Sequence, residues 1–102
     1  MGLWYVESWT ISKGDIEKHE EIFKKWVQHQ SSLIGKEGMY FRRRFGPGGG
    51  RVVMTKFESF TDFDDAFEIL NNDEKNIELR DEWASKINTE SWKGEFWIDL
   101  EI

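Results

Sequence analysis

The sequence predicts a small α+β domain whose elements follow the order β-α-β-β-α-β. The chain has 102 residues, which suits one domain. Aromatic and β-branched residues gather in four short segments, which favours strands. Between the first and second segments, and again between the third and fourth, apolar residues recur with the period of a helix. We therefore expect a single domain over residues 1–102.

The first predicted strand covers residues 3–11. Its odd positions are Leu3, Tyr5, Glu7, Trp9 and Ile11, and its even positions are Trp4, Val6, Ser8 and Thr10. Both faces carry apolar side chains, so we expect both to be covered.

The first predicted helix runs from residue 15 to about residue 32. Ser12 and Asp15 resemble a capping arrangement, and Gly35 and Gly38 stop the helix. The apolar period includes Ile16, Ile22, Phe23, Trp26 and Val27. This stripe should face the sheet.

The second and third predicted strands cover residues 38–45 and 51–58. Met39 and Phe41 share one face of the second strand, and Tyr40 and Arg42 share the other. The glycine-rich segment 46–50 predicts a hairpin loop between the two strands. The third strand is apolar on both faces, like the first.

A second helix should begin near Thr61 or Asp62, which can cap it. Residues 71–73 interrupt the helical pattern, which then resumes and includes Trp83 and Ile87. The last predicted strand covers residues 92–102. Its apolar side chains stand at even positions, namely Trp92, Phe96, Ile98, Leu100 and Ile102.

Two βαβ units joined by a hairpin give a ferredoxin-like fold, a four-stranded antiparallel sheet with the helices on one face. The other face stays open. Because it carries apolar side chains from the first and third strands, it would expose a large apolar patch on a monomer. We therefore expect a homodimer that pairs through the open sheet face.

Composition excludes several classes of function. The chain has 14 basic and 20 acidic residues and a net charge of -6, so we expect no nucleic-acid binding. It contains no cysteine, so disulfides and thiolate zinc sites are impossible. We expect no metal site, no cofactor and no membrane interaction. The N-terminal segment has no signal-peptide pattern, which predicts a cytoplasmic protein.

The middle of the chain resembles NIPSNAP-type domains. The resembling stretches are Gly38-Met39-Tyr40-Phe41, Phe45-Gly46-Pro47, Val52-Val53-Met54, Phe57-Glu58-Ser59-Phe60, Asp64-Asp65-Ala66 and Asn72-Asp73-Glu74. The overall layout is similar to the dimeric α+β barrel superfamily, which includes the antibiotic-biosynthesis-type monooxygenases. The resemblance implies that fold and a homodimer. It implies no single reaction, since the superfamily holds oxygenases, isomerases, ligand-sensing modules and members without known activity.

Two departures from the resembling families limit what is carried over. Thr55 stands in the third strand where NIPSNAP-type domains often have a tryptophan. Haem-degrading relatives use a histidine in the second half of the domain, whereas this chain has only His19 and His29, both in the first helix. The resemblance therefore does not imply haem chemistry.

The first helix carries the most informative candidate site. His19 and Gln30 project near the centre of the apolar stripe, where an unpaired polar group costs about 1–3 kcal/mol. In a cleft between helix and sheet, His19 could act as a general base or acid near neutral pH. The alternative is a hydrogen-bonded core histidine. His29 lies too far along the helix to share a metal ion with His19.

Glu7 and Arg43 form a second candidate pair, because each lies among apolar neighbours on its strand. They could line a pocket together, with Arg43 holding a negatively charged oxygen. The alternative places each charge at the dimer interface or beside a neighbour such as Lys56. The third strand should lie between their two strands.

Two hypotheses follow from these candidates. In the first, the protein is a cofactor-independent monooxygenase or isomerase for a small aromatic or enolisable substrate. His19 and Arg43 would be catalytic, and the ligand would contact Glu7, Trp9, Trp26, Gln30 and Phe41. In the second, it is a homodimeric small-molecule-binding protein without a reaction. The sequence slightly favours binding of a small apolar or aromatic ligand, and it does not decide whether the protein is an enzyme.

Overall fold

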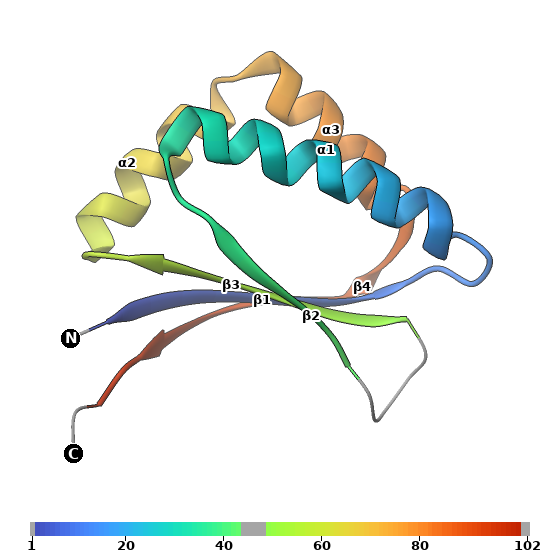
Figure 1. Ribbon diagram of the computed structural model, residues 1–102, viewed down its shortest axis with the longest axis horizontal. Coiled ribbons are helices and arrows are strands. Elements are labelled where there is room, and N and C mark those ends of the chain that lie inside the picture. The colour runs from blue at the N-terminus through green and yellow to red at the C-terminus, as the bar shows by residue number, and fades with distance from the viewer. Residues whose placement is uncertain (1, 44–48, 101–102) are drawn as a thin grey trace.

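A computed structural model describes residues 2–43 and 49–100 of the chain (Figure 1). Its elements are β1 (Leu3–Ile11), α1 (Ile16–Ile34), β2 (Gly38–Arg42), β3 (Gly50–Phe57), α2 (Phe60–Asn71), α3 (Glu74–Ala84) and β4 (Ile87–Ile98). The predicted order is confirmed, with the second helix divided into α2 and α3. The division lies at residues 71–73, where the sequence pattern breaks.

The four strands form one sheet in the order β2-β3-β1-β4. Every neighbouring pair is antiparallel, and β1 lies between β3 and β4. All three helices cover one face of this sheet, and the other face is uncovered in the single chain (Figure 1). The predicted ferredoxin-like α+β architecture is therefore confirmed. None of the helices in the described ranges is both long and apolar enough to cross a membrane.

Side chains near the helix starts differ from the predicted caps. Ser59 caps α2 by accepting a hydrogen bond from the Asp62 backbone N–H, so the prediction of Thr61 or Asp62 is wrong. Asp73 caps α3 in the same way through Asn76. Asp15 precedes α1 without a side-chain cap, and Ser12 contributes only its carbonyl to a backbone turn with Asp15. The predicted Ser12 capping arrangement is therefore absent.

The last strand begins five residues earlier than predicted. Ile87 belongs to β4 and pairs with Ile11, whereas the sequence pattern assigned it to the preceding helix. The helix ends before the turn at residues 85–86. Ile87 is apolar because it is a core residue of the strand, and it continues the helical period only by coincidence. The third strand also moves by one residue, to Gly50–Phe57. Phe45 and most of the predicted hairpin loop lie outside the described residues.

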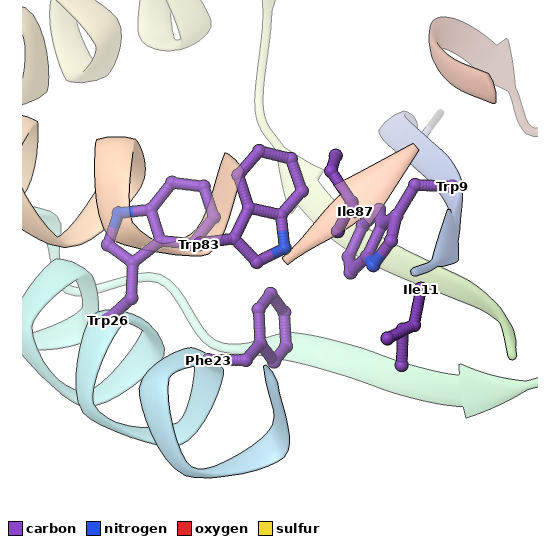
Figure 2. Packing of buried hydrophobic residues seen from close by; sticks show 6 residues of the cluster. All are labelled: Trp9, Ile11, Phe23, Trp26, Trp83 and Ile87. Atoms are coloured by element: carbon purple, nitrogen blue, oxygen red, sulfur yellow. The ribbon is translucent and has the colours of Figure 1, made fainter. Parts of the chain in front are cut away.

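The main core lies between α1, α3 and the sheet. It consists of six buried side chains, shown in Figure 2: Trp9, Ile11, Phe23, Trp26, Trp83 and Ile87. A smaller cluster around Leu3, Phe57 and Ala66 packs under α2. Burial of large aromatic rings from strands and helices fixes how α1 and α3 lie on the sheet. The space left between the two clusters holds the candidate site.

The uncovered face of the sheet carries apolar side chains. Cross-strand partners share a face, so Met39 lies beside Met54, and Phe41 lies beside Val52. Trp97 pairs with Trp4 on the same face. Met39, Phe41 and Trp97 are between 45 and 50% exposed. We call the face that carries these six side chains the open face.

Candidate functional site

A cavity of about 390 Å³ lies between the helices and the sheet. This volume falls within the range of about 300–1,000 Å³ that is typical of small-ligand sites. Its walls are mostly aromatic and aliphatic, with a few polar groups. The lining residues are Tyr5, Glu7, Trp26, Gln30, Phe67, Leu70, Asn71, Asn76, Arg80, Trp83, Ala84, Ile87, Thr89 and Trp92.

A smaller inner cavity of about 50 Å³ adjoins the large one. The residues that line both are Tyr5, Glu7, Trp26, Gln30, Phe67 and Leu70. Trp9, Lys36 and Val53 are among those that line only the inner cavity. Glu7 and Gln30 therefore stand where the two spaces meet, at the centre of the site.

Glu7 is the central acidic group of this site. It projects from β1 towards the helices, and its Oε2 accepts a hydrogen bond of 3.1 Å from the indole N–H of Trp92. No other described group hydrogen-bonds to its carboxyl. Burial raises the pKa of Glu7, and the bond from Trp92 opposes this effect only in part. The protonated carboxyl is thus favoured more than in water.

Trp92 reaches Glu7 because β4 is irregular. The pairing of β1 with β4 shifts between Ser8 and Thr10, so extra residues of β4 bulge out opposite Trp9. Ser91 holds the bulge by accepting a bond of 2.9 Å from the Thr10 backbone N–H. Bulges commonly redirect a side chain next to a functional site. Here the bulge turns Trp92 over the cavity.

Gly94 leaves the space that Trp92 needs. It stands directly opposite Glu7 in the sheet. A Cβ at this position would lie 2.6 Å from the Tyr5 hydroxyl and 2.9 Å from the Trp92 ring. Both distances are too short for real contacts, so the pairing of Trp92 with Glu7 depends on this glycine.

A buried amide forms the polar wall between α1 and α3. Asn76 is 3% exposed, and its Oδ1 accepts a bond of 2.7 Å from Trp26. Gln30 donates to the same oxygen over 3.4 Å, and Asn76 donates in turn to the Leu70 backbone carbonyl. These bonds fix the ring of Trp26 and leave the Gln30 side chain beside the cavity.

His19 lies in a separate buried network. It is fully buried, and its Nε2 accepts a bond of 2.9 Å from the Trp9 indole N–H. Its Nδ1 lies 2.9 Å from Glu20, which fixes the neutral tautomer with the proton on Nδ1. Burial lowers the pKa of His19, while the neighbouring Glu20 opposes this effect. Arg51 and Tyr40 also donate to Glu20.

Trp83 carries the one buried side-chain donor without a partner among the described residues. Its ring meets the Trp9 ring edge to face, with centroids 5.1 Å apart. Figure 2 shows the Trp83 nitrogen on the side of the ring that faces Trp9. Trp83 thus packs in the core against Trp9 and also lines the large cavity.

The structure brings together four of the residues predicted for the site. Glu7, Trp26 and Gln30 line both cavities, and Trp9 lines the inner one. It does not bring His19, Arg43 or Phe41 to them. Both nitrogens of His19 are bonded within the core, which matches the alternative of a core histidine.

Arg43 and Phe41 lie away from the cavity for reasons of topology. Arg43 follows the last residue of β2 and is exposed, and β3 separates β2 from β1 as expected. Phe41 projects from the open face, opposite to the helices. Neither residue therefore contacts Glu7.

Sequence reasoning missed Trp83, Trp92 and Arg80 as site residues. Arg80 lines the large cavity from α3, and Asn76 stands one turn before it on the same helix. Two features of the sequence could have indicated this site. One is Asn76 among apolar helix positions, and the other is Gly94 inside a strand, since such a glycine often marks a bulge or a close approach of another group. No group of three or more His, Asp or Glu side chains in the described part of the chain is placed to hold a metal ion.

Comparison with solved structures finds proteins that share this fold. A NIPSNAP family protein from Agrobacterium tumefaciens is similar over 99% of this chain and 95% of its own, with a TM-score of 0.86 and 16% identity. The fold is shared with NIPSNAP proteins. No family model and no curated protein sequence matches the chain. The likeness to NIPSNAP proteins is therefore one of structure.

Oxygenases of the same fold are also similar. SnoaB, a cofactor-independent oxygenase from Streptomyces nogalater, is similar over 99% of this chain and 95% of its own, with a TM-score of 0.75 and 11% identity. A candidate antibiotic biosynthesis monooxygenase from Nitrosomonas europaea is similar over 97% and 90%, with a TM-score of 0.74 and 14% identity. Both resemblances stated from the sequence are thus confirmed at the level of fold.

Proposed function

We propose that the protein is a homodimer that binds a small, largely apolar molecule, such as an aromatic compound, in the cavity between its helices and its sheet. The observation that carries this proposal is the cavity of about 390 Å³ with Trp26, Trp83 and Trp92 in its walls. Flat aromatic rings pack well against such walls. Few polar groups face the space, so a highly charged ligand would lose its hydration without compensation.

Tetralin, an uncharged two-ring hydrocarbon, tests the proposal. We expect it to shift the NMR signals of the indole N–H groups of Trp26, Trp83 and Trp92. Trp97, on the open face, serves as the internal control and should not respond. An Ala84→Phe variant fills the cavity from α3 and should abolish binding. Thr61→Phe, which adds the same ring at an exposed position, should not. Binding that survives Ala84→Phe would place the ligand elsewhere.

A cofactor-independent oxygenase or isomerase is the second candidate function. Glu7 favours it, because a carboxyl with one free oxygen in an apolar cavity can transfer a proton to or from a bound substrate. SnoaB shows that this fold supports oxygenase chemistry, although the low identity carries over the fold alone. Our proposal puts Glu7, rather than His19, in the position of the acid or base. Turnover of a bound enolisable compound that is lost in Glu7→Gln would establish this second function.

The open face supports the homodimer. Met39 and Phe41 on β2 and Trp97 on β4 are exposed apolar side chains on the face of the sheet that no helix covers (Figure 1). Monomers rarely leave such a face in water. Pairing two copies through it buries the apolar surface without any change in the cavity, which lies on the other side of the sheet.

A further inference from the structure

We propose that Glu7, as a protonated carboxylic acid, donates a hydrogen bond to the ligand, and that the ligand is therefore a neutral compound with a carbonyl oxygen on an apolar ring system. This inference rests on the proposed function, since it names the class of molecule that the cavity takes. It goes further by assigning one atom of the protein to one atom of the ligand.

The position of Glu7 is the first support. It lines both the large and the inner cavity, so a molecule that fills the large cavity reaches its carboxyl. Directly opposite it, Gly94 has no side chain that could cover the carboxyl. On the other side Val53 offers no hydrogen bond from its side chain. The ligand is thus the available partner for the second oxygen of Glu7.

The contact with Trp92 decides which oxygen carries the proton. An indole N–H only donates, so Oε2 must act as an acceptor. In a protonated carboxyl the carbonyl oxygen accepts best, which leaves the hydroxyl on Oε1. Among the described residues nothing accepts a bond from this hydroxyl. It therefore presents a donor to the cavity, and a carbonyl oxygen is the matching acceptor.

Other titratable groups around the cavity do not reverse this assignment. Tyr5 from β1, Lys36 before β2 and Arg80 from α3 line the two spaces. Burial and the nearby Glu7 both raise the pKa of Tyr5, so Tyr5 is neutral and places no charge beside Glu7. Arg80 contacts Asp81 over 3.6 Å, and Lys36 is paired with Asp62 over 2.7 Å. Each cation thus has a carboxylate of its own.

Two compounds that differ only in the carbonyl test the inference. 1-Tetralone has the ring skeleton of tetralin with one added carbonyl oxygen. One hydrogen bond inside the cavity should make 1-tetralone bind about tenfold more tightly than tetralin at about pH 4.5, below the raised pKa of Glu7. In Glu7→Leu the two compounds should bind equally. Glu7→Gln keeps an amide N–H donor, so it should retain the preference, and it also serves if Glu7→Leu fails to fold.

The titrations separate the inference from the proposed function. If tetralin and 1-tetralone bind the wild-type protein equally well, the cavity binds apolar molecules but Glu7 is not the anchor, and the inference fails alone. If neither compound binds, the proposed function fails together with it. A preference for 1-tetralone that persists unchanged in Glu7→Leu also overturns the assignment to Glu7.

Discussion

Glu7 makes the stability of the protein depend on pH in a direction that can be predicted. Its pKa is higher in the folded chain than the ordinary value of 4.5, so the folded state holds its proton more firmly. Stability then falls as the pH rises above the unfolded pKa, and the loss is complete above the folded pKa. Replacing Glu7 by Gln removes the ionisable group. The free energy of unfolding of Glu7→Gln should therefore exceed that of the wild type at alkaline pH.

Urea denaturation from about pH 4 to about pH 9 measures this difference. The two proteins should converge at the acid end, where Glu7 is protonated in both the folded and the unfolded state. Glu95→Gln is the matched control, because Glu95 is an exposed carboxylate on the same sheet. It should show no such gain. A constant difference between wild type and Glu7→Gln at all pH values would contradict a raised pKa.

His19 should matter for folding and not for ligand binding. His19→Ala removes the acceptor of the Trp9 indole and leaves a cavity in the core, which together should cost about 2–4 kcal/mol. The affinity for tetralin should stay within about twofold, since His19 does not line the cavity. Urea denaturation and the indole titration measure the two quantities. Loss of binding in a folded variant would return His19 to the site.

The pH profile gives a second test of His19. Its pKa is lowered in the folded state, so the unfolded state takes up a proton first. The stabilisation that neutral His19 contributes to the folded state is present above the unfolded pKa of about 6.5. It is lost as the pH falls towards the lower pKa of the folded state. His19→Ala should therefore lose less stability than the wild type between neutral and acid pH.

Among the elements, β4 shows most clearly what periodicity could not predict. Alternation correctly places Phe96 and Ile98 on one face of the strand, and the register shows that this is the helix face. The bulge before Lys93 is set by long-range contacts such as Thr10 with Ser91, which no local pattern contains. The start of β4 and the position of Trp92 were therefore beyond sequence reasoning. The surroundings of the α1 side chains could not be predicted for the same reason. The apolar stripe includes His19, but the pattern does not show whether His19 lies in the core or lines the cavity.

Gly94→Ala should uncouple Trp92 from Glu7. The added methyl group would collide with the Tyr5 hydroxyl and the Trp92 ring, so Trp92 must move. We expect a loss of roughly 1–3 kcal/mol in stability and a weaker affinity for 1-tetralone. Thermal denaturation and the Trp92 indole signal report the two effects. Lys93→Ala, at the neighbouring exposed position, should change neither. An unchanged Trp92 signal in Gly94→Ala would show that the glycine is not needed.

On the scale of the whole molecule, the two faces of the sheet carry different side chains. The face under the helices carries Glu7, Trp9 and the cavity, and the open face carries Met39, Phe41 and Trp97. The sequence predicted both faces to be apolar because β1 and β3 lack a polar side. It could not predict which face lines the cavity, since Phe41 and Trp9 look alike as aromatic strand residues. Only the strand register separates them.

The proposed homodimer should be disrupted by a substitution that leaves the cavity unchanged. Phe41→Lys places a positive charge on the open face. In a dimer that pairs through this face, the charge would be buried without a partner, which costs several kcal/mol. Sedimentation velocity should show a dimer for the wild type and a monomer for Phe41→Lys. Ile69→Lys alters an equally exposed apolar side chain on α2, in the helix layer, and should remain dimeric. A monomeric wild type would refute pairing through the open face, and dissociation of both variants would place the interface elsewhere. Because the cavity lies across the sheet, tetralin should still bind the monomeric variant.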